Sequence, residues 1–361
     1  MKHYNMAIIG LGGMGNWHRE LINEGGWWGK NYESGGFKNL KIKGSFDISE
    51  ARQKFAMEKG LIPYKSMKEL LGDPEIHIVL VATPNDLHKP IVIKALEAGK
   101  HVVCEKPVAL NSRELLQMID ASIKTDKVFA VHQNRRWDED FLTIKKIYDK
   151  KLLGEIFRIE SRVHGSRGIP EGWRSNPENG GGMVLDWGVH ILDQALQMIP
   201  EKVKKVYATL THVTNELVDD GFFAELTFEN GLVYLAEVGT SNFINLPRWY
   251  VQGRDGTAII NDFTATNGKI VRVTDWNKND AIPIRTAAGL TKTMAPRTND
   301  TIKEEALPQV KADIRDFYKN VIASIEGREP LKITLDSVMR NMKLMEAIFK
   351  SAKSGKPVAF E

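Results

Sequence analysis

Apolar residues in the first third of the chain fall in short β-branched runs, and amphipathic stretches separate these runs. The strand candidates are MAIIGLG, KIKGSFD, IHIVLVATP, HVVCEKP and VFAVHQN. In the stretch DLHKPIVIKALEAGK, apolar residues recur every three or four positions and Gly99 is suited to end a helix. Strands that alternate with helices are typical of βαβ units, so this region is predicted to form a parallel sheet.

After about residue 135 the pattern changes, because strand-like segments follow one another without helices between them. These segments are EIFRIESRVHG, KKVYATLTHV, GFFAELTFENGLVYLAEVGTS, RWYVQGRDGTAII and KIVRVTD. FFAELTF and LVYLAEV are joined by Glu229, Asn230 and Gly231, and Asn-Gly supplies the positive φ of a hairpin turn. A mostly antiparallel sheet is therefore predicted here, followed by the helical patterns ADIRDFYKNVIASIEG and SVMRNMKLMEAIFKSAKSG.

The change of pattern divides the chain into two expected domains. A length of 361 residues exceeds the usual size of one domain. We expect an α/β fold, with a doubly wound parallel-sheet domain over residues 1–134 and a second α/β domain over residues 135–361. The last helix of the second domain is free to pack back on the first.

Composition narrows the class of protein. The chain is 42% hydrophobic and 27% charged, and it has no run of about 18 uncharged apolar residues that could cross a bilayer. Its N-terminal residues lead into a strand without a signal-peptide pattern, so a cytoplasmic protein is expected. The net charge of +4 does not favour nucleic acid as a partner. Cys104 is the only cysteine, which excludes an intrachain disulfide and a cysteine-rich metal site.

The segment GGWWGKNYESGGFKN, residues 25–39, is unusually long and glycine-rich for a connection between a helix and a strand. The simpler hypothesis is a surface insertion whose Trp27 and Trp28 pack on the sheet or on another subunit. The alternative is that these aromatic rings border a sugar site or cover a cofactor.

The sequence IIGLGGMG has the spacing of a dinucleotide-binding turn. Gly10, Gly12 and Gly15 form G-x-G-x-x-G directly after a predicted strand and before a predicted helix, with Gly13 and Met14 between them. The first glycine permits the tight turn, the second lets the backbone approach a pyrophosphate, and the third lets the helix pack on the strand. All five residues are predicted to bind the cofactor.

Asp47 ends the second predicted strand, where a carboxylate accepts hydrogen bonds from the adenosine ribose. Its distance from the glycines exceeds the usual spacing of about 20 residues, and the insertion accounts for the surplus. A carboxylate repels a 2′-phosphate, so NAD is favoured over NADP.

The third predicted strand ends in ATPNDLH, which contains Thr83, Asn85 and His88. Asn85 or Asp86 could cap the following helix. The same position also suits a loop that covers the dinucleotide, and the two interpretations are compatible. We therefore count these three residues among the cofactor-binding candidates.

A second polar cluster lies in GGGMVLDWGVHILDQALQMI. On a regular helix, Asp186, His190 and Asp193 lie near one face, which also raises the alternative of a divalent metal site. No second histidine cluster supports that alternative, so no metal is predicted. Lys106 at the end of HVVCEK, together with Asp186 and His190, supplies the parts that oxidise a secondary alcohol. Lys106 would polarise the oxygen and His190 would exchange the proton, with Asp186 orienting His190.

The motifs AIIGLGGMGNWH, ATPNDLH, CEKP, HQNRRWD, GGGMVLDWGVHILD, GRDGT and SAKSGKPV occur in this order along nearly the whole chain. In this, the sequence resembles the glucose-fructose oxidoreductase / inositol dehydrogenase / MocA family. The resemblance implies a Rossmann domain and a C-terminal domain built on a large open, mainly antiparallel sheet, whose exposed face commonly forms dimers or tetramers. It also implies that Lys106 and His190 are catalytic, that Asp186 binds substrate or assists His190, that Glu105 lines the cofactor site, and that the Lys106–Pro107 peptide bond is cis.

Further residues are assigned to the cofactor or to the substrate. Gln133 is placed at the cofactor, and so is Lys106. Trp173 is placed at the substrate, because the resemblance implies that the region of Trp173 and Arg174 approaches the cofactor or the substrate. Arg136 is assigned to the substrate, with an equal alternative in which Arg135 and Arg136 are surface arginines or form interdomain salt bridges. Glu105 is expected either to lie against Lys106 or to meet the nicotinamide ribose.

The function predicted from these observations is an NAD-dependent oxidoreductase that interconverts a secondary alcohol and a ketone on a sugar, cyclitol or glycoside. One alternative is an enzyme whose tightly bound NAD is recycled within each turnover, and another is a catalytically silent NAD or sugar sensor. The expected partners are a small polyhydroxylated substrate and further copies of the chain, in a homodimer or homotetramer formed through the C-terminal sheet.

Overall fold

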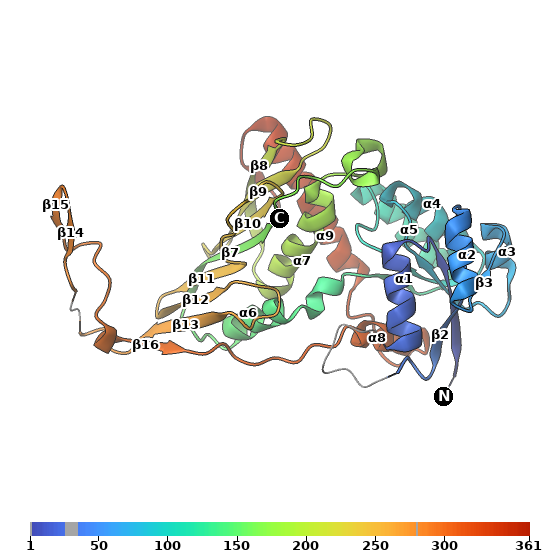
Figure 1. Cartoon of the computed structure of the whole chain (residues 1–361), viewed down its shortest axis with the longest axis horizontal. Helices are drawn as coiled ribbons and strands as arrows, with labels where there is room; N and C mark the ends of the chain where they lie inside the picture. Colours follow the sequence, from blue (N-terminus) through green and yellow to red (C-terminus); the bar gives the residue numbers. More distant parts are fainter. Residues whose placement is uncertain (1, 26–34, 279–280) are drawn as a thin grey trace.

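The computed structural model describes residues 2–25, 35–278 and 281–361. Two sheets lie toward opposite ends of the molecule, and a thin arm projects beyond the second sheet (Figure 1). The insertion is described only at its two ends, so the hypotheses about Trp27 and Trp28 concern residues outside the described part of the chain.

The first sheet is parallel throughout, and its strand order is β3-β2-β1-β4-β5-β6. Its strands are β1 (Tyr4–Ile9), β2 (Leu40–Phe46), β3 (Ile62–Pro63), β4 (Ile78–Val81), β5 (His101–Cys104) and β6 (Phe129–Val131). The helices between them are α1 (Gly13–Arg19), continued by a π-helical turn over Glu20–Glu24, α2 (Glu50–Glu58), α3 (Met67–Gly72), α4 (His88–Glu97) and α5 (Ser112–Thr125). All five predicted strands are confirmed; β3 was not predicted because two residues carry no periodic signal.

Local signals place several of these helix ends. The side chain of Asn111 accepts a hydrogen bond from the backbone N–H of Glu114, which caps α5. Gly99 follows α4 with φ +77°, a left-handed conformation in which glycine carries no steric penalty. These ends are fixed by single residues, and the sequence predicts them well.

The second sheet has nine strands in the order β16-β13-β12-β11-β7-β10-β9-β8-β17. They are β7 (Ile156–His164), β8 (Val203–Thr211), β9 (Gly221–Phe228), β10 (Val233–Gly239), β11 (Trp249–Gly253), β12 (Gly256–Ile260), β13 (Gly268–Val273), β16 (Ile302–Glu305) and β17 (Val358–Ala359). Only β7 and β10 pair in parallel, so the predicted mostly antiparallel sheet is confirmed. The predicted hairpin joins β9 to β10, and Gly231 has φ +86°.

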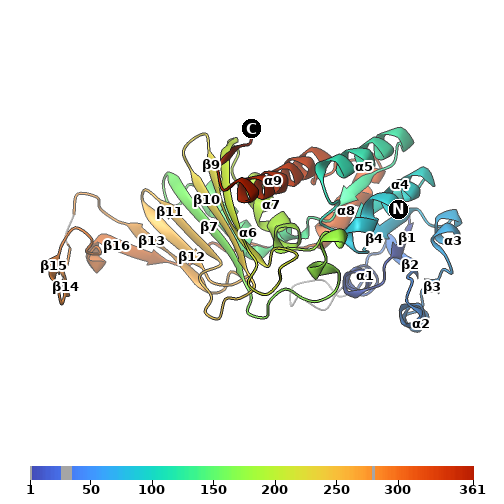
Figure 2. The same cartoon turned by 90° about the horizontal axis from the view of Figure 1, so that it is seen from above.

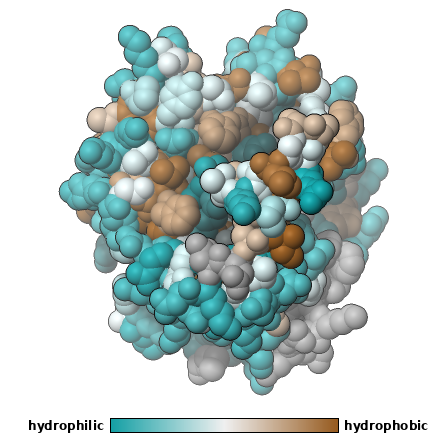
Figure 3. Space-filling model, turned by 90° about the vertical axis from the view of Figure 1, so that its left-hand side faces the viewer, coloured by the Kyte–Doolittle hydropathy of each residue, from teal (hydrophilic) through white to brown (hydrophobic). Residues whose placement is uncertain are grey.

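Helices cover one face of this sheet and leave the other open. α6 (Glu139–Asp149), α7 (Val189–Met198) and α9 (Leu335–Ser354) all lie on the side that faces the first domain (Figure 2). On the side of the molecule that bears the arm, apolar side chains alternate with polar ones (Figure 3). The arm is the two-stranded ribbon of β14 (Ile284–Thr286) and β15 (Gly289–Thr291). The sequence did not predict the arm or the edge strands β16 and β17, because these segments are short and mostly polar.

The C-terminal part of the chain returns to the first domain. Glu346 of α9 accepts hydrogen bonds from the backbone N–H and the hydroxyl of Ser112 at the start of α5. Tyr318 of α8 (Arg315–Ile325) is hydrogen bonded to His18 of α1. Among the described helices, none is both long and apolar enough to cross a membrane.

Candidate active site

A pocket of about 730 Å³ lies at the carboxyl edge of the first sheet. This is the edge at which ligands bind to open α/β sheets, and the volume lies within the range of small-molecule sites. The pocket is lined by the glycine turn, by the ends of β2, β4 and β5, and by two segments of the second domain. The lining includes Gly10, Gly12, Gly13, Met14, Asp47, Thr83, Asn85, Glu105, Lys106, Trp173, Arg174 and Asp186.

The three glycines of the fingerprint are required for three different reasons. Gly10 has φ +94°, and a Cβ there would lie 2.6 Å from the carbonyl oxygen of Ala82. A Cβ on Gly15 would lie 2.3 Å from the carbonyl oxygen of Gly10, so α1 packs closely on the turn. A Cβ on Gly12 would meet nothing within 4 Å, which leaves open space at the pocket wall. This cradle at the start of a helix fits the pyrophosphate of a dinucleotide. Gly15 supports the turn and does not line the pocket itself.

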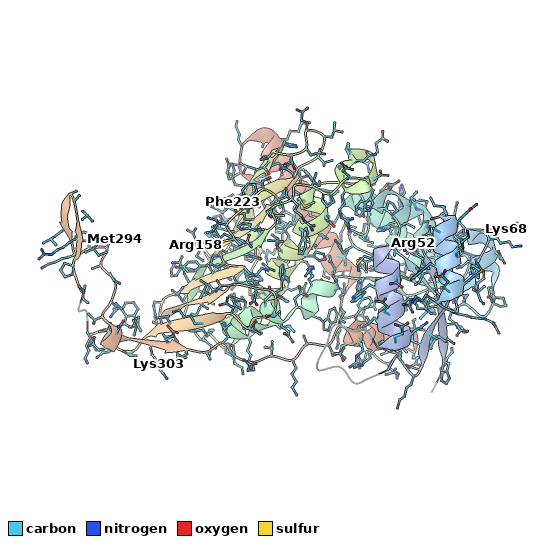
Figure 4. The ribbon with its side chains drawn as sticks, in the orientation of Figure 1. Arg52, Lys68, Arg158, Phe223, Met294 and Lys303 are labelled. Carbon is cyan, nitrogen blue, oxygen red and sulfur yellow. The ribbon has the colours of Figure 1, made fainter. Side chains whose placement is uncertain are left out.

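Asp47 follows β2, as predicted, and its carboxylate is already oriented. Its Oδ2 accepts a hydrogen bond from the backbone N–H of Leu11 at 2.8 Å, and Oδ1 accepts one from Ser49 at 2.9 Å. The lining beside Asp47 is apolar and contains Phe46, Ile48, Met67, Leu87 and Ile91. Arg52 of α2 and Lys68 of α3 do not belong to the lining (Figure 4). The end of the pocket that suits an adenosine therefore carries one anion and no lining cation.

The residues after β4 separate into two groups. Thr83 and Asn85 line the pocket, and the amide of Asn85 donates to the carbonyl oxygen of Gly180 at 2.9 Å. His88 does not line it: its Nδ1 and Nε2 lie 2.9 Å from the carbonyl oxygens of Pro107 and Thr83. The geometry therefore gives no support to the assignment of His88 to the cofactor, which stays a prediction: the buried imidazole at the start of α4 contacts the two pocket loops from behind.

Lys106 and Asp186 meet at the pocket, although they are 80 residues apart. Nζ of Lys106 donates to Oδ1 and to the backbone oxygen of Asp186, both at 2.9 Å. Nε of Arg174 donates to the other carboxylate oxygen at 3.0 Å. Burial by itself raises the pKa of Asp186, but the charges of Lys106 and Arg174 outweigh it and hold the pKa below its ordinary value. The Lys106–Pro107 peptide bond is cis, as the resemblance implied.

His190 lies one turn beyond Asp186, but the helix there is not regular. Val184–Gly188 form a π-helical turn that leads into α7, which differs from the regular helix expected from the sequence. Asp186 is bonded to Lys106 and Arg174, so the expected orientation of His190 by Asp186 is not formed. His190 is buried and, like His88, is not among the residues that line the pocket. Its Nδ1 has no hydrogen-bond partner among the described residues. Burial, followed by the charges of Lys106 and Arg135, holds the pKa of His190 well below its ordinary value, so the ring is neutral at pH 7.

Glu105 lines the pocket but is not paired with the Lys106 ammonium. Its Oε1 lies 2.7 Å from Nε2 of His18 and 2.8 Å from Nδ1 of His132, and its Oε2 accepts from the backbone N–H of Lys106 at 3.1 Å. The two histidines were missed as site residues, although both occur within the motifs GNWH and HQN. Only the tertiary structure shows that they converge, with their ring centres 4.5 Å apart.

Of the remaining candidates, some line the pocket and others do not. Trp173 lines the pocket, and the guanidinium of Arg174 lies 4.2 Å from the centre of its ring. Arg136 instead donates to both carboxylate oxygens of Asp193, at 2.8 and 2.7 Å, so it forms a salt bridge, although one within the second domain and not between the domains. This pairing also removes Asp193 from the metal site that was weighed with Asp186 and His190. Gln133 is buried and does not line the pocket, so its assignment to the cofactor is not supported by the geometry.

Comparison with known proteins agrees with this geometry. Residues 4–133 match the model of an oxidoreductase family with an NAD-binding Rossmann fold, and residues 141–259 match the GFO/IDH/MocA C-terminal domain. An NAD-binding protein from Listeria innocua superposes with a TM-score of 0.92 at 44% identity and covers 99% of this chain and 100% of its own. The scyllo-inositol 2-dehydrogenase (NADP(+)) of Bacillus subtilis is 27% identical over 82% of each chain. The myo-inositol 2-dehydrogenase of Thermotoga maritima is 29% identical over 56% of this chain and 57% of its own.

The parallel sheet, the glycine cradle and the lysine at its edge define an oxidoreductase with a nicotinamide-cofactor-binding Rossmann domain. The chain belongs to the glucose-fructose oxidoreductase / inositol dehydrogenase / MocA family, whose two domain models together match more than half of its length.

Proposed function

We propose that this enzyme is an NAD-dependent dehydrogenase that interconverts a secondary alcohol and a ketone on a sugar, cyclitol or glycoside. The observation that carries the proposal is the Lys106 ammonium, held 2.9 Å from Asp186 in the same pocket as the glycine cradle. Relatives named as inositol dehydrogenases support a cyclitol as the substrate.

The bound nicotinamide would supply the acceptor or donor of the hydride. Lys106 would donate a hydrogen bond to the reacting oxygen and stabilise its negative charge as the hydroxyl proton leaves. His190, neutral at pH 7, is the proton acceptor proposed for oxidation, and its protonated form would return the proton in reduction. Asp186 and Arg174 would orient Lys106 and contact substrate hydroxyls, while the Trp173 ring offers an apolar face to the C–H side of a polyol.

The preference for NAD over NADP is part of the proposal. Its support is the lone Asp47 carboxylate at a pocket end without a lining cation, which repels a 2′-phosphate. The Bacillus relative is named for NADP(+), so membership of the family does not by itself select NAD.

The decisive experiment follows absorbance at 340 nm with the purified protein, freed of nucleotide and given NAD or NADP with inositols, aldoses and simple glycosides. A rise with NAD and one class of polyol is the expected result. No rise with any of them, together with tight NAD binding, would contradict a freely exchanging dehydrogenase. It would favour an enzyme that recycles its bound NAD or a sensor.

We further propose that the open face of the nine-stranded sheet binds a second copy of the chain. The strand register places apolar side chains on this face, among them Phe223, Leu235, Tyr250 and Ile259. Such side chains on a large uncovered sheet suit burial against a partner.

A further inference from the structure

A buried cluster of hydrogen-bonded side chains adjoins Lys106. The hydroxyl of Tyr318 lies 2.6 Å from Nδ1 of His18, and Nε2 of His18 lies 2.7 Å from Oε1 of Glu105. Nδ1 of His132 lies 2.8 Å from the same carboxylate oxygen. Tyr318, His18 and His132 are each 0% exposed and Glu105 is 5% exposed, so these hydrogen bonds are shielded from solvent. Nε2 of His132 is buried and has no hydrogen-bond partner among the described residues.

The chemistry of these groups decides where the protons lie. Burial alone raises the pKa of Glu105, but the charge and hydrogen bond of His132, together with the hydrogen bond of His18, hold it well below its ordinary value. An ionised carboxylate only accepts, so Nε2 of His18 and Nδ1 of His132 each carry a proton. Burial lowers the pKa of His18 to about 4, so at pH 7 its ring is neutral and Nδ1 accepts from the Tyr318 hydroxyl. One directed chain of donors therefore runs from Tyr318 through His18 to Glu105.

His18, Glu105 and His132 are also residue types that bind metals, and one ligand atom of each lies within 4.8 Å of the others. Their separations of 2.7 and 2.8 Å are ordinary lengths for charge-assisted hydrogen bonds. A metal ion would have to displace both bridging protons from a site without solvent. Hydrogen bonds account for every short contact, so we interpret the cluster as a proton-ordered network.

The network is connected to the pocket through the main chain. Oε2 of Glu105 accepts from the backbone N–H of Lys106 at 3.1 Å, and the side chain of Lys106 extends from there to Asp186. The carboxylate is thus fixed on one side by two histidines and holds the backbone of the reactive lysine on the other. Tyr318 comes from α8, 300 positions after His18, so the end of the chain supports the loop that carries Lys106.

We propose that His18, His132 and Tyr318 are positioning residues for Lys106. They hold Glu105 ionised and in a fixed orientation, and Glu105 fixes the backbone and the electrostatic surroundings of the lysine. The inference rests on the role of Lys106 in the proposed function. It adds that residues from as far along the chain as α8 help to hold Lys106 in place.

The sharpest test replaces His132 by two residues of similar size. In His132→Asn the amide N–H takes the place of Nδ1–H, whereas His132→Leu offers no donor. Without the donor, the pKa of the buried Glu105 rises, and the carboxylate takes up a proton as the pH falls through the raised value. We expect the acid limb of the kcat profile to move to higher pH in the leucine variant, so that its kcat at the acid end falls to about a third or less of that of the asparagine variant, while the two agree at pH 8. The KM for NAD should stay within about twofold, and the asparagine variant should keep the wild-type profile.

A second measurement tests the donor chain without a substrate. In protein with ¹⁵N-labelled histidine, His18 should be the neutral tautomer with its proton on Nε2, and Tyr318→Phe should shift the Nδ1 resonance. Tyr64→Phe is the matched control, because the Tyr64 hydroxyl donates to Asp73 at 2.6 Å and does not contact the cluster. The His18 signal is identified by its loss in His18→Gln.

Three results would overturn the proposal: the same pH profile in the leucine and asparagine variants, a proton on Nδ1 of His18, or one equivalent of metal in the purified protein. If the wild type oxidises no polyol, it is the proposed function that fails. In that case the rate at which acetic anhydride acylates Lys106, read by mass spectrometry at pH 6, replaces kcat. The leucine variant should then be acylated several-fold faster than the asparagine variant, and equal rates would again reject the positioning role.

Discussion

At the scale of single residues, Lys106 is the group on which the proposed chemistry depends most directly. Lys106→Met keeps the length of the side chain but removes the hydrogen bonds to Asp186 and the charge that would meet the reacting oxygen. We expect kcat to fall about 100- to 1000-fold, as when one preorganised donor to a developing oxyanion is lost. Stopped-flow and steady-state rates at 340 nm measure this loss, while NADH fluorescence should show the Kd of the cofactor within about threefold. Near-normal turnover would reject the assignment.

At the same scale, Asp47 is the residue proposed to select NAD over NADP. Asp47→Asn removes the charge but keeps one acceptor oxygen, so a hydrogen bond to Leu11 or Ser49 is retained. The ratio of NADP to NAD affinity should rise about tenfold, which corresponds to about 1.4 kcal/mol. Fluorescence titration with both reduced cofactors gives the ratio. An unchanged ratio would mean that another residue selects the cofactor.

At the scale of elements, the contact between α1 and the glycine turn shapes the cradle. Gly15→Ala would place a methyl group 2.3 Å from the carbonyl oxygen of Gly10, so α1 must shift away from the turn. Overpacking of this kind costs about 1–3 kcal/mol. A thermal melt should show a lower Tm, and NAD affinity should fall with it. Gly72→Ala, at the end of α3, is the control, because its methyl group would meet nothing within 4 Å; equal melts for the two variants would contradict the close packing.

At the scale of the whole molecule, we expect copies of the chain to associate through the open face of the nine-stranded sheet. Phe223 lies opposite Glu237 on this face, beside the Arg162–Glu237 ion pair, and is labelled in Figure 4. Phe223→Glu adds an unpaired charge to the proposed interface, and burying such a charge is strongly unfavourable. Light scattering after size exclusion should show a dimer or tetramer for the wild type and a monomer for the variant. Lys68→Glu on α3 tests for a general effect of charge, and a monomeric wild type would refute the proposal.

The sequence by itself determined the features that short stretches of chain specify. The glycine turn, Asp47 at the end of β2, the hairpin at Gly231 and the cap at Asn111 depend on neighbouring residues, because turn and cap geometry are local requirements. The residue motifs were also sufficient to indicate the family and the lysine at the pocket edge. The alternation of strands and helices predicted the first sheet, and the succession of strands without helices predicted the second.

Only the tertiary structure decided which side chains meet. Arg136 pairs with Asp193, Asp186 turns to Lys106 instead of His190, and His88 supports loops. In each case a partner lies in another part of the fold, and the sequence pattern does not show which parts come together. The donor chain from Tyr318 to Glu105 is the clearest case, because burial forces these polar groups to satisfy one another only after α8 has packed against α1.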